Sequence, residues 1–167
     1  MIIRARLLCL SLVLSACSGA EDAPPDSAVD ATVDAADGRC PLAVNEVAAA
    51  GDPSDWFELV NVSAGPVDLS RFVFIDELDD PSQGAALPAT VLAPGGRHVQ
   101  EVTDATSGFA LGSSDSLWLY RVGTTVHCDG TSWRNGDSPS GGSWSRIPDG
   151  TGAFEVTTPD TRGVRNR

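Results

Sequence analysis

Lysine is absent from this chain of 167 residues, so every basic side chain is an arginine. The 11 arginines are set against 23 aspartates and glutamates, which gives a formal net charge of −12. Nucleic-acid affinity comes largely from counterions released when Lys and Arg neutralise phosphates. We therefore expect no nucleic-acid partner, and we expect anionic lipid headgroups to be disfavoured for the same reason.

Catalytic and cofactor-binding motifs are also missing. The chain has no GxSxG nucleophile elbow and no HExxH helix, and Gly141-Gly142-Ser143 lacks the lysine of a phosphate-binding loop. There are only two histidines. We expect His98 on the exposed face of a strand, whereas His127 adjoins Cys128. These absences predict a protein that is not an enzyme and that holds no cofactor.

Long apolar runs are missing too. The run Leu7 to Leu14 has eight residues, whereas a membrane-spanning helix needs about 20. Arg4 and Arg6 precede this run, and Leu14-Ser15-Ala16-Cys17 closes it. A basic start, a short apolar middle and small residues at the end are typical of a secretory signal peptide. We therefore predict that residues 1–16 are removed on export.

The closing tetrapeptide resembles the lipobox of bacterial lipoproteins, an aliphatic residue and two small residues before a cysteine. The resemblance implies that Cys17 becomes the first residue of the mature chain. Its thiol would carry a diacylglyceryl group and its amine a further acyl chain such as palmitate, which together anchor a protein stably. Ser18 implies an outer-membrane location within the cell envelope. The alternative is an unlipidated signal peptide that happens to contain a cysteine.

The cysteine count points in the same direction. Cys9 would leave with the signal peptide and Cys17 would be acylated, so Cys40 and Cys128 remain as a pair in an exported protein. We predict a disulfide between them. The competing interpretation is a metal site that includes His127, but the CxxC and HxxxH spacings of metal ligands are absent and adjacent ligands rarely face one ion.

The remaining chain divides into two parts of different composition. Residues 17–38 contain six acidic residues, no basic residue and no aromatic residue, which predicts a disordered acidic tether. Residues 39–167 contain all ten aromatic residues. Their apolar runs are short and are separated by Gly, Pro, Ser and Asp, which is typical of an all-β sandwich. The strands we expect are Leu42 to Ala48, Trp56 to Val62, Val67 to Leu69, Phe72 to Asp76, Thr90 to Leu92, Arg97 to Val102, Phe109 to Leu111, Leu117 to Arg121, Thr125 to Asp129 and Trp144 to Ile147.

Six short motifs in this part resemble the lamin-tail domain, an immunoglobulin-like β-sandwich. The family patterns "INE", "DWIELYN", "VDLSGW", "LAPGG", "GDSLWLY" and "SWGRIPDGTG" correspond in order to Val44–Val47, Asp55–Asn61, Val67–Phe72, Leu92–Gly96, Ser114–Tyr120 and Ser143–Gly152. A closing "TPGAPN" corresponds loosely to Thr161–Asn166. The residues that the resemblance identifies as fold determinants are Asn45, Glu46, Trp56, Glu58, Asn61, Pro94, Gly95, Trp144 and Arg146.

The resemblance implies a non-catalytic accessory module of the kind found on exported bacterial proteins. Two departures stand out: Arg71-Phe72 replaces the usual Gly-Trp, and Arg162 replaces a proline. The alternation of strand side chains places Phe57 and Leu59 on one face and Trp56 and Glu58 on the other. We expect Arg146 to stack on the end of the sheet or to hydrogen-bond it.

Two features are candidates for ligand binding. Asp76, Glu77, Asp79 and Asp80 supply the hard oxygens that Ca²⁺ prefers, but without EF-hand spacing, and the alternative is a solvated loop. Trp133 and Trp144 would form either a stacking platform for a sugar or, as we expect, anchors that pin the Gly- and Ser-rich tail to the core.

Together these patterns predict a lipid-anchored envelope protein. It would display a lamin-tail-like β-sandwich as a binding or scaffolding module. Its partners would be the membrane, through the lipid anchor, and a protein or glycan at the envelope, and we expect it to be a monomer. The alternatives are a structural envelope lipoprotein without a specific ligand and an accessory adhesion module that binds calcium or carbohydrate.

Overall fold

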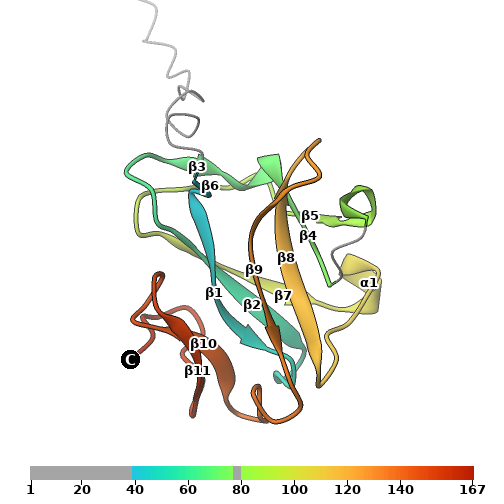
Figure 1. Cartoon of the computed structure of the whole chain (residues 1–167), viewed down its shortest axis with the longest axis vertical. Helices are drawn as coiled ribbons and strands as arrows, with labels where there is room; N and C mark the ends of the chain where they lie inside the picture. Colours follow the sequence, from blue (N-terminus) through green and yellow to red (C-terminus); the bar gives the residue numbers. More distant parts are fainter. Residues whose placement is uncertain (1–38, 77–79) are drawn as a thin grey trace, which may run out of the picture.

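The chain folds into a sandwich of antiparallel β-sheets (Figure 1). The computed structural model describes residues 39–76 and 80–167. The predicted signal peptide, the tether and Cys17 therefore lie outside the described residues, as do Glu77 and Asp79. The all-β prediction is confirmed, since helix is confined to short turns. Among the described residues, no helix is both long and apolar enough to cross a membrane.

One sheet has five strands in the order β11-β10-β1-β2-β7, and the other has four in the order β5-β4-β8-β9. A small pair, β3-β6, closes one end. The strands are β1 Leu42–Ala48, β2 Asp55–Asn61, β3 Val67–Asp68, β4 Phe72–Ile75, β5 Ala85–Ala86, β6 Val91–Leu92, β7 Arg97–Val102, β8 Asp115–Arg121, β9 His127–Trp133, β10 Ser143–Ile147 and β11 Ala153–Thr157. The helical turns are η2 Leu69–Arg71, η3 Pro81–Gln83 and α1 Asp104–Ser107.

The apolar core lies between the two large sheets. Strand alternation directs Phe57 and Leu59 of β2 into it, where both are fully buried, as the sequence predicts. The Phe57 ring meets Phe74 of β4 edge to face, with centroids 4.8 Å apart. On β1 the pairing register shifts between Val44 and Glu46. Such an irregularity re-aims side chains, and Asn45 and Glu46 are both buried outside the apolar core cluster.

Most predicted strands are found within two residues of their expected bounds, but the prediction of a strand at Phe109 to Leu111 is wrong. This segment is a loop after α1, from which Phe109 and Leu111 reach the core individually. Apolar residues two positions apart gave it a strand-like pattern. The Leu111 N–H donates to the Asp55 carboxylate at 3.2 Å, that is, to a side chain and not to the backbone of a neighbouring strand. Strands β5 and β11 and helix α1 are additional to the predicted elements.

The strands run between two ends that we name for use below. The basic end comprises residues 39–41, 62–71, 88–96 and 121–127, where the described chain begins. The acidic end comprises residues 49–55, 76, 103–115 and 134–142. The η3 loop, residues 80–84, lies between the two ends and lines a hollow with residues 121–125. In Figure 1 β1 begins at the basic end, near β3 and β6. The register agrees, because Leu42 pairs with Asn61 at one end of β1 and Ala48 with Trp56 at the other.

Candidate functional site

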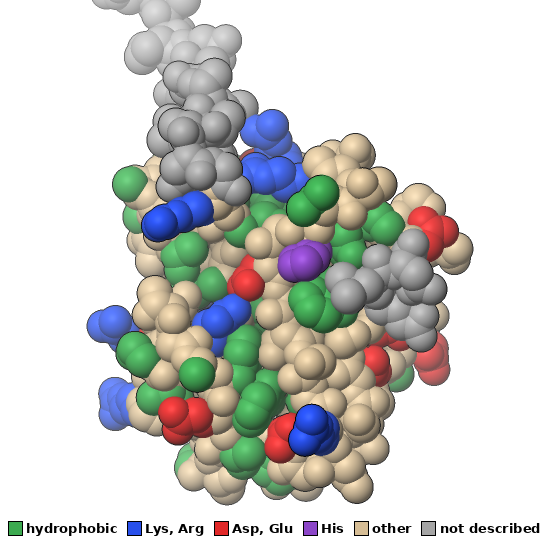
Figure 2. Space-filling view, viewed as in Figure 1, with side chains coloured by type: hydrophobic (Ala, Val, Ile, Leu, Met, Phe, Trp, Pro, Cys, Tyr) green, Lys and Arg blue, Asp and Glu red, His purple; other side chains and the backbone are tan. Residues whose placement is uncertain are grey.

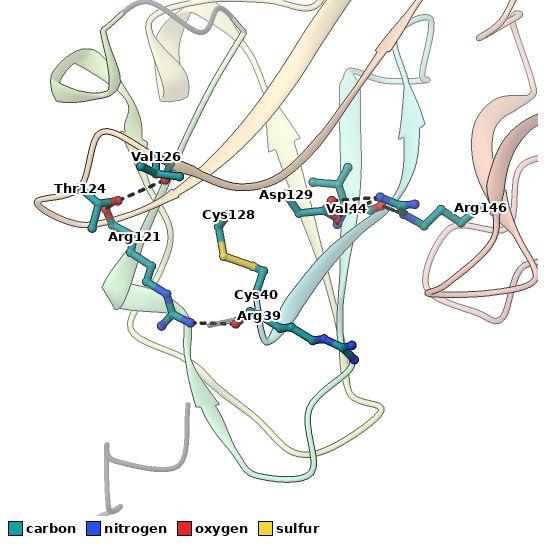
Figure 3. Close-up of a disulfide and its surroundings, with 9 residues drawn as sticks. All are labelled: Arg39, Cys40, Val44, Arg121, Thr124, Val126, Cys128, Asp129 and Arg146. Atoms are coloured by element: carbon teal, nitrogen blue, oxygen red, sulfur yellow. Dashed lines mark hydrogen bonds and ion pairs between the residues drawn. A yellow bond between two sulfur atoms is a disulfide. The ribbon is translucent and has the colours of Figure 1, made fainter. Parts of the chain in front are cut away.

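A disulfide joins the two sheets at the basic end (Figure 3). Cys40 directly precedes the first strand, and Cys128 lies near the start of β9. Their Cα atoms are 5.1 Å apart, and the bond closes a sequence separation of 88 residues. The predicted Cys40–Cys128 pairing is therefore present. The thiols are consumed in this bond, so the alternative of a metal site that uses Cys128 is contradicted.

Four of the predicted motif residues lie on the far side of the five-stranded sheet, away from the apolar core: Asn45, Glu46, Trp56 and Glu58. The C-terminal segment, residues 158–167, crosses this side and is held there by hydrogen bonds. Glu46 is fully buried, and its two carboxylate oxygens accept from the Thr161 N–H and from the Thr161 hydroxyl, each at 2.8 Å. The Ser143 hydroxyl of β10 donates to the same carboxylate at 2.5 Å. One buried acid thus joins three segments distant in sequence.

Glu58 holds the next part of the C-terminal segment. It lies directly opposite Glu46 in the sheet and is also fully buried. Its carboxylate accepts from the Asn45 amide and from the Gly163 N–H, both at 2.9 Å, and forms an ion pair with Arg97 at 3.3 Å. Burial is the main cause that raises the pKa of Glu58 to about 7, with the Asn45 hydrogen bond and Arg97 opposing and Glu46 reinforcing the shift.

Asp149 completes this group at the β10–β11 turn. Its carboxylate accepts from the Asn45 amide and the Asn166 N–H, each at 3.1 Å, and pairs with Arg97. Burial opposes ionisation of Asp149, but these hydrogen bonds outweigh it and hold its pKa below the usual value. We call this set the polar cluster; its members are Asn45, Glu46, Glu58, Arg97, Asp149, Thr161 and Asn166.

Paired buried carboxylates are a common arrangement for acid–base catalysis, so the polar cluster is the strongest candidate for a catalytic site among the described residues. The C-terminal segment covers it, and the protein itself supplies the donors to Glu46 and Glu58. Every donor is a backbone N–H, a hydroxyl, an amide or a guanidinium of this chain. The arrangement therefore holds the chain terminus on the sheet, and it offers a substrate no access while the segment is in place.

The motif residues Asn61, Pro94 and Gly95 stabilise a turn at the basic end. The Asn61 amide donates to the carbonyl oxygens of Gly65 and Leu92 at 2.8 and 2.9 Å, and Gly95 donates its N–H to the Asn61 carbonyl. Gly95 has a φ of +72°, a conformation that glycine adopts without steric cost. These residues determine the fold locally, as the sequence predicts.

Arg146 connects the two sheets through hydrogen bonds. Its guanidinium donates to the carbonyl oxygens of Val44 and Gly152 and to both carboxylate oxygens of Asp129 on β9. It also lies 4.5 Å from the centroid of the Phe154 ring. Both expectations for Arg146, stacking and hydrogen bonding, are confirmed.

The tryptophans are packed and not displayed. Trp133 is 3% exposed and donates its indole N–H to the Gly112 carbonyl. Trp144 stacks on Phe154, with centroids 5.8 Å apart, and bonds the Thr131 hydroxyl. Trp56 is buried beneath the Arg162 guanidinium, 5.4 Å from its ring. The alternative of a Trp133–Trp144 sugar platform is therefore wrong, because Trp133 is buried and the ring of Trp144 is stacked on Phe154.

The acidic stretch proposed for calcium is described only in part. Asp80 caps η3: its carboxylate accepts from the Ser82 hydroxyl and N–H and from the Gln83 amide, which lower its pKa. Within residues 39–76 and 80–167, no group of three or more potential metal ligands is found. Asp80 thus serves its own loop, while Glu77 and Asp79 lie outside the described residues.

The two histidines occupy different settings. His98 is half-buried on β7 and contacts the Gln100 amide oxygen at 3.2 Å, so it is less exposed than predicted. His127 is exposed at the start of β9 and packs beside Trp118, with centroids 5.0 Å apart.

Sequence reasoning missed several partners of the predicted residues. Three residues outside the six motifs bind motif residues: Asp129 binds Arg146, Arg97 binds Glu58 and Thr161 binds Glu46. The sequence separations are 17 residues for Asp129 and Arg146 and 115 for Thr161 and Glu46. The loose likeness of residues 161–166 to the closing family pattern was the one signal that marked this segment.

Comparison of the chain with protein-family models, curated proteins and solved structures gives no match in any of the three.

Proposed function

We propose that this protein is a lipid-anchored envelope protein that displays its β-sandwich as a non-catalytic binding or scaffolding module. The observation that carries the proposal is the cysteine arrangement. Two cysteines, Cys40 and Cys128, are joined in a disulfide, a bond characteristic of exported proteins. The other two, Cys9 and Cys17, lie in the sequence that has the pattern of a lipoprotein signal peptide.

The distribution of chemistry within the sandwich favours display over catalysis. Its buried carboxylates, Glu46 and Glu58, are engaged with the C-terminal segment. Its tryptophans pack against the protein. The order of the sequence motifs supports a module of the lamin-tail type, and in the proposed arrangement the loops at the ends of the strands are the surfaces available to partners.

A pair of cysteine variants tests the anchor. The full chain is expressed in a bacterium with labelled palmitate, and membrane association is measured by partitioning into a detergent phase. Cys17→Ser should abolish both labelling and partitioning. Cys9→Ser changes a cysteine eight positions earlier in the same apolar segment and should leave both unchanged. Labelling that survives Cys17→Ser would overturn the proposal.

A further inference from the structure

The two ends of the sandwich carry opposite charge. The basic end contains Arg39, Arg71 and Arg121 and a single acidic residue, Asp68. The acidic end contains one arginine, Arg134, and six aspartates: Asp52, Asp55, Asp76, Asp104, Asp115 and Asp137. Asp80, in the η3 loop between the ends, lines a hollow with Arg121. In Figure 2 several blue side chains lie together at the top of the view and others lie on the left flank and at the bottom, whereas most red side chains lie away from the top. The net charge of the whole chain conceals this separation.

The three arginines of the basic end form one continuous patch. Arg121 lies at its centre, because it lines one hollow with Arg71, Val122 and Thr124 and a second hollow with Arg39 and Val126. Its guanidinium donates to the Arg39 carbonyl at 3.3 Å (Figure 3). The same guanidinium lies 5.4 Å from the Phe72 ring centroid. The Val122 N–H donates to the Arg71 carbonyl at 2.8 Å, which ties the β8–β9 turn to η2.

Exposed apolar side chains lie within the same patch. Val122 is 58% exposed and Val126 is 74% exposed, and both belong to the β8–β9 turn. Val62 and Val91, 45% and 53% exposed, also belong to the basic end. Apolar side chains at a turn, ringed by arginines, match the chemistry of a bilayer interface, where acyl chains and anionic headgroups meet.

The carboxylates near this patch accept hydrogen bonds from groups other than its arginines. Asp80, which lines a hollow with Arg121, accepts from Ser82 and Gln83. Asp68 accepts from the Ser70 N–H and hydroxyl. Asp129 pairs with Arg146, and Asp149 pairs with Arg97 and Arg165. Among the described residues, neither Arg71 nor Arg121 forms an ion pair with a carboxylate. Arg71 and Arg121 are thus not neutralised by ion pairs with the described carboxylates.

We propose that the basic end is a docking surface for an anionic lipid bilayer, with Arg39, Arg71 and Arg121 on the headgroups and Val122 and Val126 at the interface. This inference rests on the proposed function, since the lipid anchor would hold the surface near the bilayer. Cys17 lies 22 positions before Arg39, so the anchor and the patch are separated by at most about 80 Å of chain. The chain enters at the basic end, and the acidic end is repelled by the same headgroups.

The proposal revises the expectation that anionic lipids are disfavoured. That expectation used the summed charge, whereas screening limits electrostatic interactions to about 10 Å in ordinary salt. A bilayer in contact with the basic end therefore interacts with the three arginines and only weakly with the acidic end. One arginine near such a surface changes the affinity about fivefold.

Arginine footprinting on membranes tests the orientation. The acylated full chain is reconstituted into vesicles of phosphatidylcholine alone or of phosphatidylcholine with phosphatidylglycerol. An arginine-specific dicarbonyl reagent is added, and modification is measured by peptide mass spectrometry. We expect Arg71 to react severalfold more slowly on the anionic vesicles, and high salt to remove the difference. Arg134, an exposed arginine of the acidic end, should react equally on both. Equal reactivity of Arg71 on both vesicles would contradict the proposal.

A second measurement separates the surface from the anchor. The Cys17→Ser chain, which cannot be acylated at that position, is mixed with the same vesicles and floated on a density gradient. We expect association with anionic vesicles only, weakened more than fivefold by Arg71→Glu and unchanged by Arg134→Glu. If neither vesicle retains the Cys17→Ser chain, the docking surface is wrong even when the acylated chain floats. If the wild-type chain carries no acyl group, the anchor fails but a positive flotation result still supports the surface.

Discussion

The two ends of this sandwich use their charged residues differently. At the acidic end the carboxylates hold their own loops: Asp55 accepts from the Leu111 N–H, Asp115 from the Gly112 N–H and Asp137 from the Arg134 N–H. At the basic end the disulfide joins the two sheets. Arg71 forms no ion pair with a carboxylate among the described residues. The acids are therefore largely structural, whereas Arg71 is exposed and available to a partner.

The difference shows why the total charge of a small domain is a poor guide to its contacts. Six aspartates at one end add strongly to the net charge, yet several are engaged within the protein. Three arginines at the other end add little to the sum but lie together on one surface. The following predictions test whether the two ends are distinct in stability as well as in charge.

Removing the disulfide should have the largest effect. The bond closes a loop of 88 residues at the basic end, and the chain-entropy account gives about 4–5 kcal/mol for a loop of this size. We expect the Cys40→Ser, Cys128→Ser double variant to lose most of that amount in urea unfolding. Reductant should destabilise the wild type similarly and leave the double variant unchanged. Equal stability of variant and wild type would show that the disulfide contributes nothing.

Arg146→Met should cost about 2–3 kcal/mol, because it removes the donor to the Val44 and Gly152 carbonyls and the counter-ion of the Asp129 carboxylate, which keeps the Val44 N–H. The matched control is Arg134→Met at the acidic end, where the side chain is exposed and the change should stay within about 0.5 kcal/mol. Chemical unfolding measures both. Similar losses for the two variants would remove the distinction between a bridging arginine and a surface one.

The polar cluster between the ends should respond to pH through Glu58. Its pKa is raised from 4.5 to about 7, so the folded state binds this proton more tightly than the unfolded state. The resulting stabilisation is complete below pH 4.5 and is lost as pH rises through about 7.

Glu58→Gln keeps the uncharged form at every pH. Relative to wild type, we expect it to gain about 1–3 kcal/mol in unfolding free energy between pH 5 and pH 8. Glu155→Gln, at an exposed position of β11, should track the wild type. A wild type that gains stability over this interval relative to Glu58→Gln would show the opposite sign and refute the assignment.

Calcium should have the smallest effect. Asp80 is bonded to Ser82 and Gln83, and no group of three or more potential ligands is found among the described residues. We therefore expect millimolar calcium to leave the thermal midpoint unchanged. Magnesium serves as the control for a nonspecific divalent effect. A midpoint raised by calcium and not by magnesium would restore the calcium interpretation and would give the acidic end a ligand of its own.

Local patterns in the sequence predicted most of the fold and little of its connectivity. Alternation placed Phe57 and Leu59 in the core, and the motif residues Asn45, Glu46 and Glu58 were selected before their partners were visible. The partners, Thr161 and Gly163, come from a segment more than 100 positions away. The segregation of charge was likewise hidden, because Arg39, Arg71 and Arg121 are separated by many residues and meet only through strand pairing.

Charged paramagnetic cosolutes test the difference between the ends most directly. Amide relaxation in the purified Cys17→Ser chain is measured with an anionic probe and then with a cationic one of similar size. Amides of residues 121–127 should relax faster with the anionic probe, and those of residues 103–115 faster with the cationic one. A cationic preference at both ends would contradict the account, because the arginine patch would then have no positive potential to present to a membrane.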